Sequence, residues 1–291
     1  MSSSPRRPPA FPLRLDALAA RPKPVVSKPR SPSPVLALPA APTPARAVLR
    51  PQRPLANAYL DTSRRSTPSG LGLDSADVRL RMAQRLRAMG VRHERVLGAI
   101  GNVPRHLFVD AALVTQAYED TSLPIGHGQT ISKPSVVARM IELLFGGANA
   151  RAADSLGRVL EIGTGCGYQA ALLALLARHV ISVERLKPLH DKARELLAPL
   201  RPAHLRLVYG DGMRGHPPNA PYDSIIAAAG GDALPQAWLD QLAIGGRLVS
   251  PVRDGGGERQ VLVVVDRTEL GDVRTVHEAV NFVPLKSGLV A

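Results

Sequence analysis

The feature that most limits the fold of this chain is a regular alternation of short apolar segments with helical ones after residue 157. We predict strands at "RVLEIG", "HVISVE", "LRLVYGDG", "YDSIIAAAG" and "GGRLVSPV", and helices at "YQAALLALLAR", "LKPLHDKARELLAPL" and "LPQAWLDQL". Strands that alternate with helices at this spacing form a parallel sheet with helices on both faces. Two final strands, "RQVLVVVDR" and "VRTVHEAVNFVPL", have no helix between them and should pair antiparallel. The sequence therefore predicts an α/β fold with a doubly wound, mostly parallel seven-stranded sheet.

A helical part over residues 74–150 is predicted to precede the sheet core over 151–291, within one domain. In "LDSADVRLRMAQRLRAMG", Asp74 or Ser75 is the expected N-cap and Gly90 the expected stop. The inward face of this helix should carry four apolar side chains at helical spacing: Val78, Met82, Leu86 and Met89. A second, short helix should bury Val96, Leu97 and Ile100. A third should begin at Pro134 and bury Val136, Val137, Met140, Ile141 and Leu144.

Residues 1–73 are predicted to form a disordered N-terminal arm. Of the 27 prolines, 15 lie within the first 70 residues, and proline supports neither helix interiors nor sheet ladders. The same 70 residues hold 12 Lys or Arg against two acids, which leaves 25 basic and 22 acidic residues in 71–291. The net charge of +13 therefore belongs mainly to the arm. Because the rest of the chain is nearly balanced in charge, a nucleic-acid partner is not expected except through the arm. A solvated extension without a partner and an electrostatic or proline-recognition segment both remain open.

The sequence also indicates where the protein works. No uninterrupted apolar h-region of a signal peptide is present, and no apolar run approaches the ~18 residues needed to cross a membrane. A single cysteine, Cys166, excludes an intramolecular disulfide and a cysteine-based zinc cluster. We expect a cytoplasmic protein without a metal or a membrane partner. A site within one sheet further suggests a monomer.

A glycine-rich turn, "VLEIGTGCGYQ", follows the first strand of the predicted sheet. Its glycines, Gly163, Gly165 and Gly167, allow a ligand to approach the backbone closely. A dinucleotide fingerprint would need glycine where this chain has Tyr168, which disfavours NAD(P) and favours S-adenosyl-L-methionine. Glu184, at the end of the second strand, is placed to accept both ribose hydroxyls, although this position fits NAD as well. Asp211, after the third strand, is placed to accept from an adenine amino group. A tight strand-to-helix turn without a ligand is the alternative.

The stretch "LPIGHGQTISKPS", residues 123–135, is predicted to be a loop that leads into the helix at Pro134. Its polar residues include Thr130 and Ser132. Ser132 lies two residues before Pro134, where an N-cap is expected, so its hydroxyl has a structural explanation. A helix N-terminus also attracts anions, so a cap and a ligand-binding role are compatible.

Several motifs together resemble one family. "LPIGHGQTISKP", "VLEIGTGCGYQAALLA", "VISVER", "GDG", "YDSIIAAA", "FVPL" and "VPRHLFV" are similar to the protein-L-isoaspartate O-methyltransferases over about residues 76–291. The resemblance implies a Rossmann-like class I methyltransferase fold and methyl transfer from S-adenosyl-L-methionine to the free carboxylate of L-isoaspartyl residues in damaged proteins and peptides. The ester closes to a succinimide that reopens partly to aspartate. One segment, "AAAGGDALP", is richer in glycine than the Ala-Pro-rich segment expected of the family.

The resemblance also implies the site residues. Ser132 corresponds to the active-site serine of the family, with Thr130 beside it. The expected cofactor site consists of Glu161, Gly163, Thr164, Gly165, Gly167, Glu184, Arg185, Asp211 and Gly212. The attacking group is a carboxylate with a pKa of about 4, so no general base is required. Cys166 is accordingly interpreted as a turn residue, His127 as a loop residue and Trp238 as a packing residue. An RNA methyltransferase and a non-catalytic binding module are the remaining alternatives.

Overall fold

The structure is a computed structural model that describes residues 76–200, 202–255 and 259–291. The predicted arm and both candidate N-caps of the first helix lie outside these residues. Helix α1 (Ala76–Ala88) buries Met82 and Leu86, as predicted. Met89 is 59% exposed, so its predicted inward position is wrong, because the helix ends one residue earlier. Helix α2 (Glu94–Asn102) buries its predicted apolar face.

The stretch predicted to be a loop is instead an antiparallel hairpin, which we call the acceptor hairpin after the role predicted for its Thr130 and for Ser132. Two turns of 3-10 helix, η4 (Arg105–Phe108) and η5 (Ala111–Gln116), lead into its strands β1 (Leu123–Gly126) and β2 (Gln129–Ile131). The turn is tight because Gly126, His127 and Gly128 all have positive φ angles, of 95°, 54° and 68°. Leu123, Ile125 and Ile131 are buried, so one face of the hairpin packs on the core.

The remaining elements form the sheet and its covering layers. In chain order they are α3 (Pro134–Phe145), α4 (Ala148–Ala153), β3 (Arg158–Ile162), α5 (Tyr168–Leu176), β4 (His179–Glu184), α6 (Lys187–Leu197), η6 (Ala198–Leu200), β5 (Leu205–Tyr209), η7 (Gly212–Arg214), η8 (Pro217–Asn219), β6 (Tyr222–Ala227), α7 (Gln236–Asp240), β7 (Leu242–Arg253), β8 (Gln260–Thr268) and β9 (Gly271–Val280). Helix α3 buries most of its predicted face, while Val136 is only partly buried.

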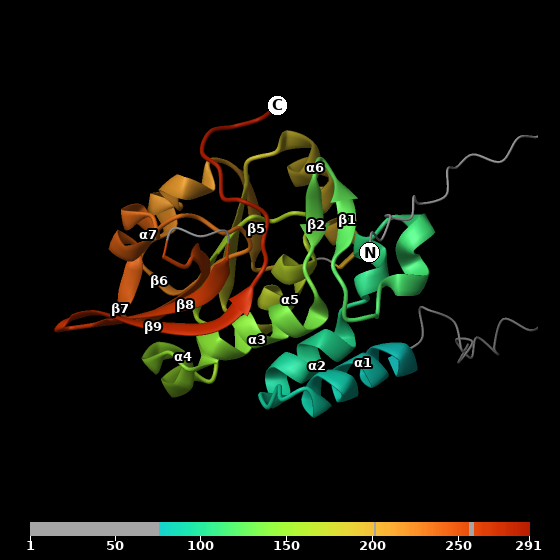
Figure 1. The fold of residues 1–291 in the computed structure, drawn as a ribbon, viewed down its shortest axis with the longest axis horizontal. Coiled ribbons are helices and arrows are strands. Elements are labelled where there is room, and N and C mark those ends of the chain that lie inside the picture. Colours follow the sequence, from blue (N-terminus) through green and yellow to red (C-terminus); the bar gives the residue numbers. More distant parts are fainter. Residues whose placement is uncertain (1–75, 201, 256–258) are drawn as a thin grey trace, which may run out of the picture. The chain divides into compact units, whose positions relative to one another are not determined.

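The seven-stranded sheet has the order β5-β4-β3-β6-β7-β8-β9 (Figure 1). The pairs from β5 to β7 are parallel, and β8 is antiparallel to both of its neighbours. The mostly parallel sheet and its antiparallel final pair are therefore confirmed. The hairpin of β8 and β9 projects beyond the other strands at one side of the sheet (Figure 1).

The two faces of the sheet are covered unequally. In β3, Val159 packs with the cluster that contains α2, α3 and α5, whereas Leu160 and Ile162 pack with the opposite cluster. That second cluster is closed mainly by Trp238 and Leu239 of the five-residue helix α7. This arrangement leaves the carboxyl ends of β3 and β4 facing the acceptor hairpin, which is the edge where open α/β sheets bind ligands.

Candidate active site

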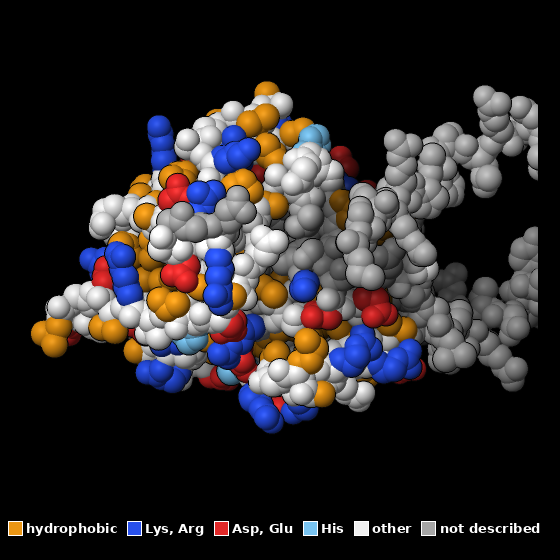
Figure 2. All heavy atoms as spheres, in the orientation of Figure 1, with side chains coloured by type: hydrophobic (Ala, Val, Ile, Leu, Met, Phe, Trp, Pro, Cys, Tyr) orange, Lys and Arg blue, Asp and Glu red, His pale blue; other side chains and the backbone are white. Residues whose placement is uncertain are grey.

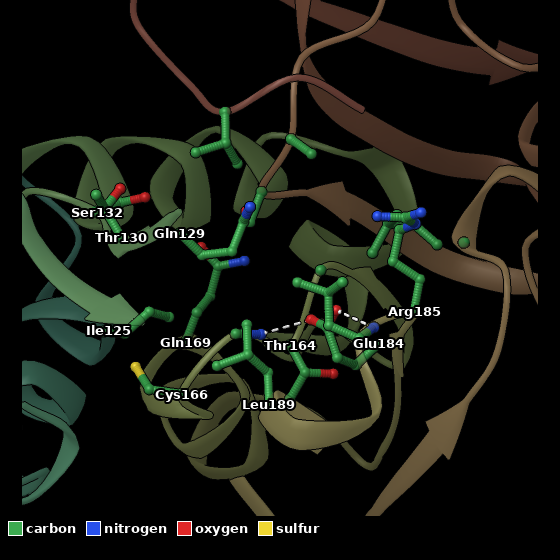
Figure 3. Close-up of a pocket in the computed structure, with 18 of the residues that line it drawn as sticks. Ile125, Gln129, Thr130, Ser132, Thr164, Cys166, Gln169, Glu184, Arg185 and Leu189 are labelled. Atoms are coloured by element: carbon green, nitrogen blue, oxygen red, sulfur yellow. Dashed lines mark hydrogen bonds between the residues drawn. The ribbon is translucent and has the colours of Figure 1, made fainter. Parts of the chain in front are cut away.

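A cavity of about 260 Å³ lies at the carboxyl ends of β3 and β4. It is far larger than the ~30 Å³ that one water molecule occupies. Most of its lining comes from the acceptor hairpin, the glycine turn with the start of α5, the end of β4 with the start of α6, and a C-terminal segment (Figure 3). Val137, Gly212, Ala228 and Ala229 complete it. The predicted site residues that line this cavity are Thr130, Ser132, Gly163, Thr164, Gly165, Glu184, Arg185 and Gly212. Three predicted residues, Glu161, Gly167 and Asp211, do not line it.

The glycine turn needs glycine for two different reasons. Gly165 has a φ of +56°, and a Cβ there would lie 3.3 Å from Ile125 Cδ1 of the acceptor hairpin. A side chain at this position would therefore be strained and would press on the opposite wall of the cavity. At Gly167, with a φ of +92°, a Cβ would lie 2.9 Å from Leu197 Cδ1. Gly167 thus serves the packing of α5 against α6 rather than the cavity itself.

Two backbone N–H groups hold the Glu184 carboxylate in place. One carboxylate oxygen, Oε2, accepts from the N–H of Gly165 at 2.9 Å, and Oε1 accepts from the N–H of Leu186 at 2.9 Å (Figure 3). Each oxygen of a carboxylate has two lone pairs, so one acceptor position remains on each. Two remaining acceptors on one rigid carboxylate suit a pair of adjacent ribose hydroxyls. The residues present therefore fit the ribose of the expected cofactor.

Glu161 lies behind the glycine turn and is completely buried. Ser182 Oγ donates to its Oε2 at 2.5 Å and lies 2.6 Å from Thr164 Oγ1. Thr164 is one of the residues that line the cavity. Burial raises the pKa of Glu161 to about 8, against the opposing effect of the hydrogen bond from Ser182. The Glu161 carboxyl is therefore largely protonated at neutral pH. Within the described residues, its buried Oε1 has no hydrogen-bond partner.

Arg185 and Asp211 both bind the C-terminal segment, residues 283–290, which we call the C-terminal strap. Asp211 Oδ2 accepts from the N–H of Gly288 at 2.8 Å, and its Oδ1 accepts from the N–H of Met213 at 3.0 Å. Arg185 donates from Nε to the carbonyl of Gly288 at 2.9 Å. The adenine contact predicted for Asp211 stays a prediction, whereas the structure shows both of its oxygens engaged by backbone.

The other end of the strap is held by Gly230. Its N–H donates to the carbonyl of Val283 at 2.9 Å, and its carbonyl accepts from the N–H of Leu285 at 2.8 Å. A Cβ on Gly230 would lie 2.6 Å from Gln260 Nε2, so the crowded position leaves little room for a side chain. This crowding gives a physical reason for a glycine in "AAAGGDALP". The strap lines the cavity through residues 283–286.

The acceptor hairpin places Thr130 and Ser132 on one face of an extended segment, because residues two apart point the same way. The intervening Ile131 is buried, whereas Thr130 is exposed and Ser132 is half-buried. The predicted capping role of Ser132 is wrong. Lys133 occupies the N-cap position of α3 without a side-chain cap, and Asp120 instead accepts from the N–H and hydroxyl of Ser135, each at 2.8 Å.

Two predictions near the cavity agree with the structure, and one lining residue was not predicted. Burial raises the pKa of the Cys166 thiol to about 11, which keeps it protonated and agrees with a turn residue. Trp238 is completely buried, as predicted, and its Nε1 also donates to the carbonyl of Gly212 at 2.8 Å. Gln169 lines the cavity from the first turn of α5 and was not predicted. Its position directly after the glycine turn is the sequence feature that could have identified it as a cavity residue.

The described ranges contain no group of three or more His, Cys, Asp or Glu that could hold a metal ion. Within the same ranges, no helix is long and apolar enough to cross a membrane. On the face seen in Figure 2, Lys and Arg side chains are interspersed with Asp and Glu rather than gathered in one patch. This mixture agrees with the nearly balanced charge of residues 71–291.

Comparisons with known proteins agree on one family. The model of the family described as "Protein-L-isoaspartate(D-aspartate) O-methyltransferase (PCMT)" matches residues 79–289. A protein-L-isoaspartate O-methyltransferase of Methylibium petroleiphilum is 59% identical over 289 residues, which are 99% of each chain. One from Leptothrix cholodnii is 64% identical over 243 residues, covering 82% of this chain and 84% of the relative. A solved protein-L-isoaspartate O-methyltransferase is similar with a TM-score of 0.64 at 28% identity, covering 72% of this chain and 67% of that one.

Proposed function

Because the chain belongs to the protein-L-isoaspartate(D-aspartate) O-methyltransferase family, we propose a role in that family's reaction for each side of its cavity. The chain is an S-adenosyl-L-methionine-dependent enzyme that methylates the free carboxylate of L-isoaspartyl residues in damaged proteins and peptides. A backbone nitrogen then displaces methanol from the ester and closes a succinimide, so methylation begins the repair.

The donor side of the cavity would hold S-adenosyl-L-methionine. We assign Glu184 to the ribose hydroxyls, because its carboxylate is oriented by two backbone N–H groups and keeps two acceptor positions. Gly163 and Gly165 let the backbone approach the ligand, and Thr164, Arg185 and Gly212 line the same space. When bound, the cofactor supplies a methyl group on a sulfonium, which a carboxylate can attack. Glu161 supports the turn from behind through Ser182.

The acceptor side would hold the isoaspartyl carboxylate on Thr130 and Ser132. This carboxylate is ionised at neutral pH, so positioning and exclusion of water supply most of the rate enhancement. A hydroxyl can orient one carboxylate oxygen while the other attacks, whereas an ion pair with Lys or Arg would lower its nucleophilicity. Ser132 is suited to this role because its hydroxyl does not cap α3.

One observation carries this assignment. Thr130 and Ser132 of the acceptor hairpin line the same cavity as Gly165 and Glu184, although the two pairs lie about 30 to 50 residues apart in the sequence. A single cavity therefore joins the proposed acceptor groups to the proposed donor groups, as direct methyl transfer requires.

The function is tested with labelled S-adenosyl-L-methionine and paired peptides that differ only in L-isoaspartate or L-aspartate. We expect base-labile methylation of the isoaspartyl peptide alone. Labelling of both peptides to the same extent, or of neither while the cofactor binds, would contradict the assignment. Addition of RNA to the same reaction tests the alternative acceptor class.

The role of Ser132 is tested by Ser132→Ala. Loss of a hydrogen bond to a charged group costs about 1.5–3 kcal/mol, so we expect kcat for the isoaspartyl peptide to fall by roughly 10- to 150-fold. Ser135→Ala is a matched control, because its hydroxyl bonds to Asp120 rather than facing the cavity. Turnover of Ser132→Ala within about twofold of the unsubstituted enzyme would remove the hydroxyl from the mechanism.

The remaining proposals concern location, assembly and the arm. The single cysteine favours a reducing compartment, so we propose a cytoplasmic enzyme, and the single-sheet site favours a monomer. Cell fractionation and sedimentation equilibrium test these two points. We propose that only the basic residues of 1–73 could attract nucleic acid. Salt-sensitive RNA binding that survives deletion of residues 1–73 would contradict that proposal.

A further inference from the structure

Arg105 is a buried cation that forms no ion pair with any residue the structure describes. It lies on η4 with a relative exposure of 0%. None of the ion pairs between described residues includes it. Burial lowers the pKa of Arg105, but a guanidinium stays protonated in proteins. Such a buried, unpaired charge is costly and therefore calls for a reason.

The hydrogen bonds of Arg105 converge on the base of the acceptor hairpin. Its Nη2 donates to the carbonyl of Ser132 at 2.8 Å, directly after β2. The same nitrogen lies 3.5 Å from the carbonyl of Thr121, shortly before β1. Its Nε donates to the carbonyl of Ala117 at 2.8 Å. One guanidinium thus contacts both ends of the hairpin and the segment that leads into it.

The same guanidinium also contacts the donor side of the cavity. Its Cζ is 4.8 Å from the centre of the Tyr168 ring, a cation–π contact. Tyr168 is completely buried, follows Gly167 directly and begins α5. Arg105 therefore contacts both the acceptor hairpin and the end of the glycine turn.

Space filling alone does not explain this residue. An apolar side chain of similar length would occupy the same volume without the cost of desolvating a charge. It could not donate to carbonyls on two segments while resting on an aromatic ring. The planar fork of arginine does this with one rigid group, which neither Met nor Lys reproduces.

We propose that Arg105 is a positioning residue for methyl transfer, which fixes the acceptor hairpin relative to the glycine turn so that Thr130 and Ser132 face the methyl donor. This inference rests on the proposed role of the hairpin. Arg105 lies outside the residues that line the cavity, so it acts through Ser132 and Tyr168 and not on the reacting atoms.

The test compares Arg105→Met and Arg105→Lys with a matched control, Arg85→Met. Arg85 Nη2 donates to the carbonyl of Tyr118 at 2.6 Å, so the control also removes an arginine bond to the segment before the hairpin without touching either cavity wall. For each full-length variant we would measure kcat with the isoaspartyl peptide, the Kd of S-adenosylhomocysteine and the hydrogen exchange of residues 123–133 and 158–184.

We expect Arg105→Met to lower kcat by about 100-fold, while the Kd of S-adenosylhomocysteine stays within threefold of the unsubstituted value. Hydrogen exchange should become faster in residues 123–133 but not in residues 158–184. Arg105→Lys should recover part of kcat, and Arg85→Met should lower Tm without changing kcat. A kcat of both Arg105 variants within threefold of the unsubstituted enzyme would overturn the inference. So would a loss of kcat matched by an equal rise in Kd and by faster exchange in both segments. If Arg105→Met does not fold, Arg105→Lys carries the same comparison.

Parallel measurement of Ser132→Ala separates this inference from the proposed function. Unchanged turnover of Ser132→Ala with low kcat of the Arg105 variants would remove the hydroxyl role and leave the positioning role standing. Low turnover of Ser132→Ala with normal Arg105 variants would overturn only the positioning role.

Discussion

The donor and acceptor sides of the cavity are built in different ways. On the donor side, the backbone N–H groups of Gly165 and Leu186 hold Glu184. Glu184 ends β4, which has a neighbouring strand on each side in the sheet. On the acceptor side, Thr130 and Ser132 lie on a two-stranded hairpin whose base is held from outside by Arg105. The sheet therefore determines the donor geometry, whereas long-range side-chain contacts determine the acceptor geometry.

This difference indicates which property a substitution on each side of the cavity should change. Substitutions on the donor side should change cofactor affinity, because the turn and the carboxylate exist independently of the hairpin. Substitutions on the acceptor side should change turnover with little effect on cofactor affinity. The C-terminal strap forms a third element, since it lines the cavity but is held by Arg185, Asp211 and Gly230 of the sheet region.

The largest effect is expected at Glu184. Glu184→Ala removes both proposed ribose contacts and leaves the N–H groups of Gly165 and Leu186 without their acceptor. Two bonds to a charged group at about 1.5–3 kcal/mol each predict a rise of at least about 100-fold in the Kd of S-adenosylhomocysteine, measured by calorimetry. Glu195→Ala, on the exposed side of α6, is the control. A Kd within threefold of the unsubstituted value would contradict the ribose assignment.

A smaller effect is expected when the strap is shortened. Deletion of residues 287–291 removes the strap partners of Arg185 and Asp211. With fewer bonds to hold the strap over the cavity, S-adenosylhomocysteine should dissociate roughly 10-fold faster in stopped-flow measurements.

The same deletion sharpens the role of Asp211. Asp211→Asn should have no further effect on the dissociation rate in the shortened chain if Asp211 acts only by holding the strap. If Asp211→Asn further weakened the binding of S-adenosylhomocysteine to the shortened chain, this result would instead support the predicted contact with adenine. An unchanged dissociation rate after deletion would show that the strap does not retain the ligand.

The smallest effect on turnover is expected at Glu161. Its substitution should instead change how the stability of the protein depends on pH. The pKa of Glu161 is about 8 in the folded chain, above its usual value of 4.5, because it is buried. The folded state thus holds a proton that the unfolded state has released, and this contribution to stability is lost as pH rises from 4.5 to 8. Between these two pKa values, the free energy of unfolding should fall by about 1.4 kcal/mol per pH unit. Glu161→Gln should flatten this slope in urea unfolding at pH 5, 6.5 and 8; an unchanged slope would contradict a protonated Glu161.

The donor side was the part most readily predicted from sequence, because its signals are local. The glycine turn lies between β3 and α5, and Glu184 ends the neighbouring strand, so spacing along the chain was enough to place them. The sheet with its antiparallel final pair was predictable for the same reason, since each strand has its own apolar segment.

The acceptor side was less predictable because its contacts are distant in the sequence. Strand β2 has only three residues, and the turn of Gly126, His127 and Gly128 has the composition of a loop. Ser132 resembled a helix cap, but the carboxylate of Asp120, 15 residues before Ser135, bonds to the first turn of α3. The strap likewise joins Asp211 to Gly288 across 77 residues, which no local pattern indicates.

The division between donor and acceptor sides is tested most directly by the Kd of S-adenosylhomocysteine for Ser132→Ala, measured by calorimetry. The two-sided cavity predicts a Kd within about twofold of the unsubstituted enzyme, while turnover of the isoaspartyl peptide falls by roughly 10- to 150-fold. A Kd that rises in proportion to the loss of turnover would contradict the account, because the hairpin would then belong to the cofactor site itself.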